Sequence, residues 1–252
     1  MVRLWLASFV ALVSLVAPRP AAGEDALVAV AANFAAPMQE IASEFAMAKG
    51  HHANLVVGAT GKLYAQIRSG GPFDVFVAAD AATPEKLVAE GLAVRGSAFT
   101  YARGKLVLWS AQPGFVDLAG DVLKGGRFRH LAIANPKLAP YGAAAVQVLD
   151  ALGLTDLLRP KLVFGESIAQ VAQFVATSNA ELGFVAWSQL AAPGQPQVGS
   201  YWLVPASLYS PIQQVAVLLE HGASNPAARA LCDYLKSAKG RQVIRSYGYE
   251  LP

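Results

Sequence analysis

Hydrogen-bond donors stand at four places where an expected strand gives way to an expected helix. They are Asn33, Thr60 within Gly58-Ala59-Thr60-Gly61, Tyr141 within Ala139-Pro140-Tyr141-Gly142, and Ile168 directly after Ser167. The first N–H groups of a helix lack partners within the helix and favour a negative charge. Residues at such turns could together hold an oxyanion. Each turn alone is also explained by ordinary helix capping, with Thr60 as the cap of its helix.

Other chemistry has little support in the sequence. The four histidines are His51, His52, His130 and His221, and Cys232 is the single cysteine. None has a second ligand at a metal-binding spacing, and the motifs HExxH, CxxC and GxSxG do not occur. We therefore expect no enzyme, no cofactor and no site for a free metal ion. A secreted α/β hydrolase, with a Ser or Asp nucleophile beside one of the histidines, stays open as an alternative.

The elements that must position the donors alternate along the chain. The pattern predicts strands near 27–31, 54–57, 74–77, 105–109, 130–134, 162–164, 182–185, 202–204 and 213–219. It predicts helices near 36–49, 62–69, 83–90, 142–152, 168–177 and 226–236. Such alternation is typical of an α/β fold. Ligands of open α/β sheets bind at the carboxyl ends of strands, so the four turns can face one cleft.

Composition narrows the class of protein further. The chain has 252 residues, of which 54% are hydrophobic and 15% charged, so it can bury a large core and is too apolar for a disordered segment. The length allows one large or two modest domains. Lys and Arg are scattered rather than clustered, which argues against a nucleic-acid partner.

Residues 1–23 have the features of a secretory signal peptide. Arg3 precedes an apolar run from Leu4 to Ala17, and small residues follow up to Gly23. The run is shorter than the roughly 20 residues that span a bilayer. Cleavage after Gly23 would remove Arg3 and Arg19 and lower the formal charge from +3 to +1. We expect an exported, periplasmic protein without a lipid anchor, because no cysteine lies near the cleavage point.

Several segments of the mature chain carry a family resemblance. They are 31–34, 38–42, 58–67, 71–80, 133–136, 139–142, 182–185 and 247–249, of which DVFVAAD (74–80) and APYG (139–142) are the most specific. With them the chain resembles the periplasmic molybdate-binding proteins of ABC transporters, which have a type 2 periplasmic-binding fold. The resemblance covers nearly the whole mature chain.

The resemblance implies two lobes, each a mixed sheet flanked by helices, with the ligand cleft between them. Lobe 1 would comprise 24–103 and 208–252, and lobe 2 would comprise 104–207, with crossings at 101–104 and 206–212. Molybdate or tungstate would be the ligand, and a monomer would pass it to an inner-membrane ABC permease.

The resemblance also implies the ligand set. Asn33 would donate by its side chain or backbone N–H, and Thr60 by its hydroxyl and N–H. Tyr141 and Ile168 would donate mainly by backbone N–H groups from the second lobe.

The chain departs from the family pattern at three positions. Asn33 and Thr60 stand where well-known members have serine, and Ala186 stands where some have a tyrosine whose hydroxyl reaches the anion. Tyr141 could supply that missing donor. Asp74 and Asp80 would repel an anion, so we interpret Asp74 as structural and Asp80 as a cap of the next element.

A site built from neutral donors suits a fully ionised tetraoxyanion, which only accepts hydrogen bonds. A protonated phosphate would leave a proton unpaired, at a cost of about 1–3 kcal/mol or more. Molybdate and sulfate share charge and shape, so cavity size must separate them. Sulfate or another small oxyanion therefore remains an alternative ligand. An effector domain of a regulator is disfavoured by the export signal.

Overall fold

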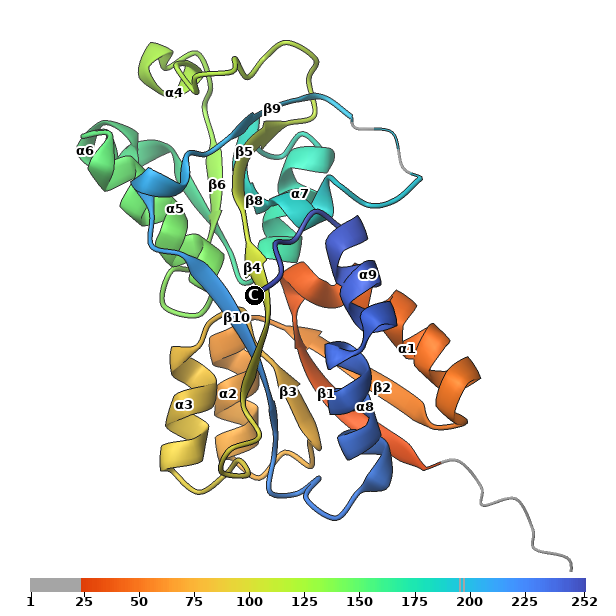
Figure 1. Cartoon of the computed structure of the whole chain (residues 1–252). Coiled ribbons are helices and arrows are strands. Elements are labelled where there is room, and N and C mark those ends of the chain that lie inside the picture. Colours follow the sequence, from red (N-terminus) through yellow and green to blue (C-terminus); the bar gives the residue numbers. More distant parts are fainter. Residues whose placement is uncertain (1–23, 195, 197) are drawn as a thin grey trace, which may run out of the picture.

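Two five-stranded mixed sheets form the framework of the protein (Figure 1). The structure, a computed structural model, describes residues 24–194, 196 and 198–252, so the expected signal peptide lies outside the described residues. The first sheet has the order β2 (His52–Gly58), β1 (Asp25–Ala31), β3 (Val75–Val77), β10 (Ile212–Leu218) and β4 (Phe99–Gly104). The second has the order β7 (Leu162–Gly165), β6 (Leu131–Ala134), β8 (Leu182–Ala186), β5 (Leu106–Ser110) and β9 (Ser200–Leu203).

The two sheets share one plan of strand directions. β1 pairs in parallel with β2 and β3, and β6 pairs in parallel with β7 and β8. β10 and β5 then add antiparallel, each between a parallel strand and an edge strand. Parallel neighbours need a crossover helix, which explains the strand-helix alternation in the sequence. The expected α/β class with two mixed sheets is confirmed.

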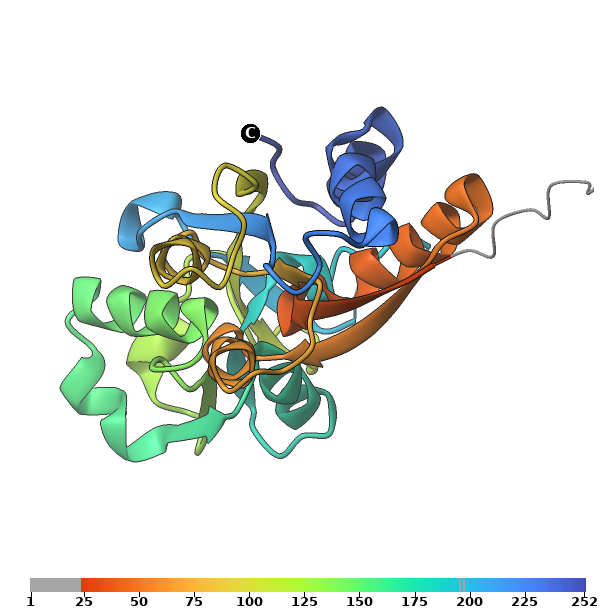
Figure 2. The same ribbon diagram turned by 90° about the horizontal axis from the view of Figure 1, so that it is seen from below.

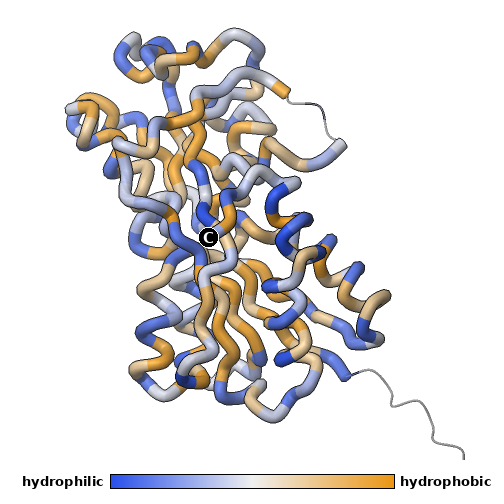
Figure 3. The backbone as a smooth tube through the Cα atoms, in the orientation of Figure 1, coloured by the Kyte–Doolittle hydropathy of each residue, from blue (hydrophilic) through white to orange (hydrophobic). Residues whose placement is uncertain are grey.

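Helices cover both faces of the first sheet (Figures 1 and 2). α1 (Ala35–Lys49), α8 (Pro226–Lys236) and α9 (Ala238–Ser246) pack on one face, and α2 (Thr60–Arg68) and α3 (Ala82–Ala89) on the other. Successive residues of β1 accordingly enter different cores, Val28 beside the α1 side chains and Ala29 beside those of α2. Burial on both faces explains why its central strands β1 and β3 are almost entirely apolar (Figure 3).

The second sheet is enclosed in the same way. α5 (Pro140–Ala151) and α7 (Ile168–Ala176) are its crossover helices, and their side chains join one continuous core with the strands. The shorter helices α4 (Val122–Gly125) and α6 (Thr155–Leu158) lie at its periphery (Figure 1). Short 3-10 turns are η1 (Ala32–Phe34), η2 (Arg159–Lys161), η3 (Trp187–Gln189) and η4 (Ala206–Leu208).

The chain passes between the sheets twice. β4 continues almost directly into β5 through Lys105, and β9 returns to β10 through 204–211. The C-terminal tail lies against this junction, where Arg103 and Glu250 exchange backbone hydrogen bonds of 2.7 and 3.1 Å. The expected crossings near 101–104 and 206–212 lie close to these passages. The lobe bounds at 104 and 208 stay a prediction.

The expected elements are present within a few residues of their predicted bounds, but the sequence did not reveal α4, α6, α9 or β4. α9 carries few apolar residues and contains Gly240. It forms because Ser237 accepts a hydrogen bond from the Gly240 N–H, at 3.2 Å, and because Val243 and Ile244 are buried against α1 and α8. β4 has a polar edge-strand sequence, so only its pairing with β10 defines it.

A membrane-spanning helix is distinguished by its length and its apolar character. Within the described residues, no helix combines the length and the apolar character needed to cross a bilayer.

Candidate functional site

The four predicted site residues line one cavity between the two sheets. Asn33, Thr60, Tyr141 and Ile168 share it with Ala31, Ala32, Ala59, Ala79, Ala139 and Pro140. These residues follow β1, β2, β3, β6 and β7, so the cavity lies at the carboxyl ends of parallel strands from both sheets. Its free volume in this arrangement of the lobes is about 10 Å³, so the lining residues lie close together.

Helix N-termini from both sheets meet at the cavity. Thr60 is the first residue of α2, Tyr141 the second of α5, and Ile168 the first of α7. The backbone N–H groups of these positions have no acceptor within their own helix. No charged side chain occurs among the described residues that line the cavity. The site thus offers neutral donors and the positive ends of helix dipoles.

Thr60 does not cap its helix. It is 2% exposed, and its Oγ1 accepts a hydrogen bond from the Ala79 N–H at 3.2 Å. The N-cap of α2 is Ala59, which makes no side-chain cap. The alternative interpretation of Thr60 as a structural cap is therefore wrong. Because the oxygen accepts from Ala79, the hydroxyl proton can be donated to an acceptor in the cavity.

The side-chain amide of Asn33 is used within the protein. Its Nδ2 donates to Gln214 Oε1 and to the Tyr249 hydroxyl, both at 2.9 Å. The backbone carbonyl oxygen of Asn33 accepts from the Tyr249 hydroxyl at 2.8 Å and from Ser188 Oγ at 2.9 Å. Of the two donors we expected from Asn33, the backbone N–H is thus the one left for the cavity.

The Tyr141 hydroxyl lies against the junction between the sheets. It accepts a hydrogen bond from Gln214 Nε2 at 3.0 Å. A Cβ at Gly104 would come within 2.0 Å of this hydroxyl, so only glycine leaves room for it. Burial raises the pKa of Tyr141 well above its ordinary value, so the hydroxyl keeps its proton. That it replaces the donor lost at Ala186, which is buried at the end of β8, stays a prediction.

Direct contacts hold the two lobes together at the cavity. The Gly61 N–H donates to the Leu138 carbonyl at 2.8 Å. Gly61 directly follows Thr60, and Leu138 lies three residues before Tyr141. Lys62 and Glu166 form a salt bridge across the cleft, with both side chains about half exposed. Lys62 is therefore outside the cavity. These contacts define a closed arrangement of the lobes.

Asp74 and Asp80 have the structural roles predicted for them. Asp74 accepts from the Leu27 N–H at 2.7 Å and lies 3.0 Å from His221 Nδ1. Asp80 accepts from Thr83 N at 2.9 Å and from Thr83 Oγ1 at 3.0 Å, in the first turn of α3. Burial raises the pKa of Asp80.

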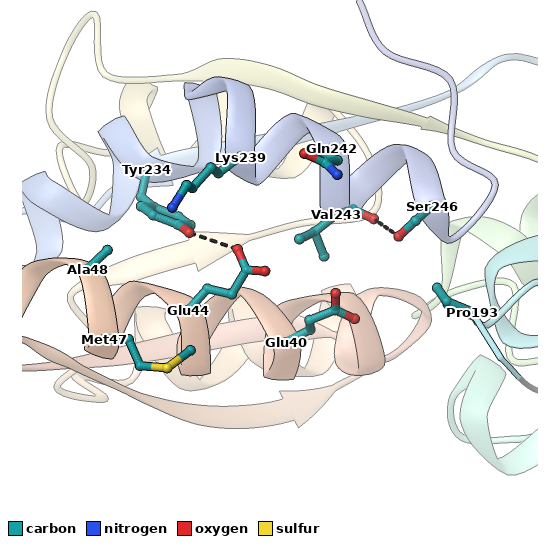
Figure 4. A pocket seen from close by; sticks show the side chains of 10 residues that line it. All are labelled: Glu40, Glu44, Met47, Ala48, Pro193, Tyr234, Lys239, Gln242, Val243 and Ser246. Carbon is teal, nitrogen blue, oxygen red and sulfur yellow. Dashed lines mark hydrogen bonds between the residues drawn. The ribbon is translucent and has the colours of Figure 1, made fainter.

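A larger groove lies elsewhere and does not suit an anion. It measures about 580 Å³ and runs between α1 and the helix pair α8 and α9 (Figure 4). Two carboxylates, Glu40 and Glu44, face a single cation, Lys239. The Tyr234 hydroxyl donates to Glu44 Oε2 at 2.9 Å. The small cavity is the better candidate because of its chemistry. Among the described residues, no cluster of three His, Cys, Asp or Glu side chains could hold a metal ion.

Sequence reasoning did not identify Gln214, Ser188 and Tyr249 as neighbours of the site. Gln214 does carry a signal, since it is a polar residue inside the apolar strand Ile212–Leu218. A polar side chain at such a position must find a buried partner.

Two mixed sheets joined by two crossings, with a neutral donor cavity between them, define a two-lobed solute-binding protein. Residues 26–250 match the model of the bacterial extracellular solute-binding proteins. The chain is 62% identical over 224 residues to the molybdate-binding protein ModA of Azotobacter vinelandii, with 89% of each chain covered. It is 52% identical to the protein of that name from Rhodobacter capsulatus, with 91% of this chain and 90% of that one covered.

A solved structure agrees with these relatives. The periplasmic molybdate-binding protein of Azotobacter vinelandii superposes with a TM-score of 0.88 at 43% identity, over 90% of this chain and 99% of that one. The chain therefore belongs to the molybdate-binding proteins within the bacterial extracellular solute-binding family.

Proposed function

We propose that this protein captures molybdate or tungstate between its lobes in the periplasm and delivers it to an ABC permease. The observation that carries the proposal is the interlobe cavity. Three helix N-termini and the hydroxyl of Thr60 meet there, and no charged side chain lines it among the described residues. The names and fold of the relatives support the same ligand and compartment. We also propose that the protein acts as a monomer and uses no cofactor.

The cavity chemistry favours an anion that carries no protons. N–H and O–H groups can all donate to a tetraoxyanion, and none of them has to accept. Phosphate is partly protonated at neutral pH, and its O–H would face donors only, which leaves a buried donor unpaired. Discrimination against phosphate then follows from hydrogen bonding rather than from size.

Sulfate is the nearest competing ligand, since it has the charge and shape of molybdate. With the same donors available to both, the oxygen-to-oxygen span of the anion decides which one contacts all of them. The small cavity requires close contact on every side, so the donor distances in the closed state set the preference. The names of the relatives do not favour sulfate over molybdate.

Catalysis is not part of the proposal. Asp74 does lie beside His221, as a hydrolase dyad would require. The Asp74 carboxylate is buried and also binds the Leu27 N–H, and neither residue lines the interlobe cavity. The pair therefore supports a structural role.

The test is thermal unfolding of the ligand-free protein with molybdate, tungstate, sulfate and phosphate, each at the same concentration. Ligand at about 1,000 times its Kd adds roughly 4 kcal/mol of stability. We expect a large rise in the melting temperature with molybdate and tungstate and little change with phosphate. A larger rise with sulfate would favour the sulfate alternative. Protein that responds to none of the four anions would contradict the proposal.

A further inference from the structure

Gln214 is an uncharged polar side chain in the interior of the molecule. It is 0% exposed and lies on β10, the strand that returns from the second sheet to the first. The pairing of β10 with β4 shifts in register between Gln214 and Val215. A shift of this kind redirects a side chain and is common beside functional sites.

The Gln214 amide bonds to both lobes at once. Its Oε1 accepts from Asn33 Nδ2 at 2.9 Å and from the Tyr101 hydroxyl at 2.8 Å, both in the first lobe. Its Nε2 donates to the Tyr141 hydroxyl at 3.0 Å, in the second lobe. Two donors on one side and one acceptor on the other fix which end of the amide faces each lobe. Neither a carboxylate nor an apolar side chain could make all three bonds.

The backbone near Gln214 is shaped around this link. At Gly104, on the neighbouring passage between the sheets, a Cβ would lie 2.6 Å from Gln214 Nε2 and 2.0 Å from the Tyr141 hydroxyl. Any side chain at Gly104 would thus force the amide and the hydroxyl apart. The glycine provides a second observation, independent of the hydrogen bonds, that the contact is built into the junction.

We propose that Gln214 is a positioning residue for anion binding, which holds Asn33 and Tyr141 at the cavity and couples their positions across the two lobes. Gln214 does not itself line the cavity, so it acts through these two residues. This inference rests on the proposed function. It predicts that Gln214 contributes to affinity although it makes no contact with the ligand.

The coupling has a physical basis in burial. No buried side-chain nitrogen or oxygen in the described residues lacks a hydrogen-bond partner. Opening the lobes about the junction would stretch the bond between Gln214 and Tyr141, and the freed groups would need water. The bond therefore favours the closed arrangement in which Asn33 and Tyr141 reach the same ligand.

The experiment is a double-mutant cycle on molybdate binding, measured by titration calorimetry with the full mature protein. Its variants are Gln214→Met, which keeps the length of the side chain but removes the amide, Tyr141→Phe, and the pair together. Each single change should raise the Kd about tenfold, the loss expected for one hydrogen bond in a buried network. The Kd of the double variant should be no more than about three times the higher Kd of the two single variants, because both changes remove the same hydrogen bond.

A matched control separates positioning from stability. Asp74 is also buried and hydrogen-bonded in the first lobe, but it precedes β3 and so lies at the end of the sheet away from the cavity. Asp74→Asn should lower the melting temperature and leave the Kd unchanged. If Gln214→Met fails to fold, Tyr141→Phe breaks the same link from the other lobe.

The outcomes are distinct. Failure of the unaltered protein to bind molybdate would overturn the proposed function. Normal molybdate binding by Gln214→Met would overturn the inference alone. Fully additive effects of Gln214→Met and Tyr141→Phe would also overturn it, because Tyr141 would then act on the ligand independently of Gln214.

Discussion

Thr60 carries the clearest single donor to the cavity. Its hydroxyl oxygen is occupied by the Ala79 N–H, which turns the hydroxyl proton toward other acceptors. Thr60→Val keeps the branched shape and removes the hydroxyl, so it should weaken molybdate binding by about 1–3 kcal/mol, the cost of losing a hydrogen bond to a buried charge. Titration calorimetry measures this directly.

The control for Thr60 comes from its own chemistry. Thr60→Ser keeps the hydroxyl and should bind molybdate with nearly the affinity of the unaltered protein. Equal affinity in Thr60→Val and Thr60→Ser would remove the Thr60 hydroxyl from the ligand set.

At the scale of elements, the start of α2 presses on the segment before α5. A Cβ at Gly61 would lie 3.1 Å from Leu138 Cα and 3.2 Å from its carbonyl oxygen, closer than ordinary contact. Gly61→Ala should therefore hold the lobes slightly apart and weaken molybdate binding by about 1 kcal/mol, the low end for an overpacked contact. The ligand-free protein should not be destabilised, since alanine favours a helix over glycine by up to about 1 kcal/mol.

A comparison of melting temperature and Kd tests this contact. Gly125→Ala is the matched control, because a Cβ at Gly125 in α4 meets nothing within 4 Å. Both variants should melt at or above the temperature of the unaltered protein, and only Gly61→Ala should lose affinity. Unchanged affinity in Gly61→Ala would mean that Gly61 and Leu138 do not meet in the bound state.

At the scale of the whole molecule, tyrosines buried near the junction of the lobes make the fold sensitive to alkali. Burial raises the pKa of Tyr249 to about 12, and it raises those of Tyr101 and Tyr141 well above the ordinary value. In the unfolded chain these groups titrate near pH 10. The folded state therefore holds more protons above pH 10, and stability falls as pH rises from there through about 12.

Denaturant unfolding at a series of pH values measures this loss. The tyrosines should leave stability unchanged from neutral pH to about pH 9 and lower it steeply above pH 10. Tyrosinate absorbance of the folded protein should show a group of tyrosines that ionises late. Titration of all eight tyrosines at their ordinary pKa, with the fold intact, would contradict the buried network.

The sequence by itself determined the local features of this protein, namely most of its strands and helices and the residues at its helix N-termini. Apolar runs and helix periodicity set most strands and helices, and the turns that begin α2, α5 and α7 placed Thr60, Tyr141 and Ile168 at helix N-termini. These properties depend on residues within a few positions of one another, which is why spacing could predict them.

Only the tertiary structure decided how the donors are used. Asn33 bonds to Gln214 and Tyr249, which lie 181 and 216 positions away in the chain, and no local pattern encodes such partners. The partners of Asn33 and the role of the Tyr141 hydroxyl follow from how the two sheets pack at their junction. The existence of β4 follows from its pairing with β10. A buried polar group must find a partner, but packing alone determines which partner is within reach.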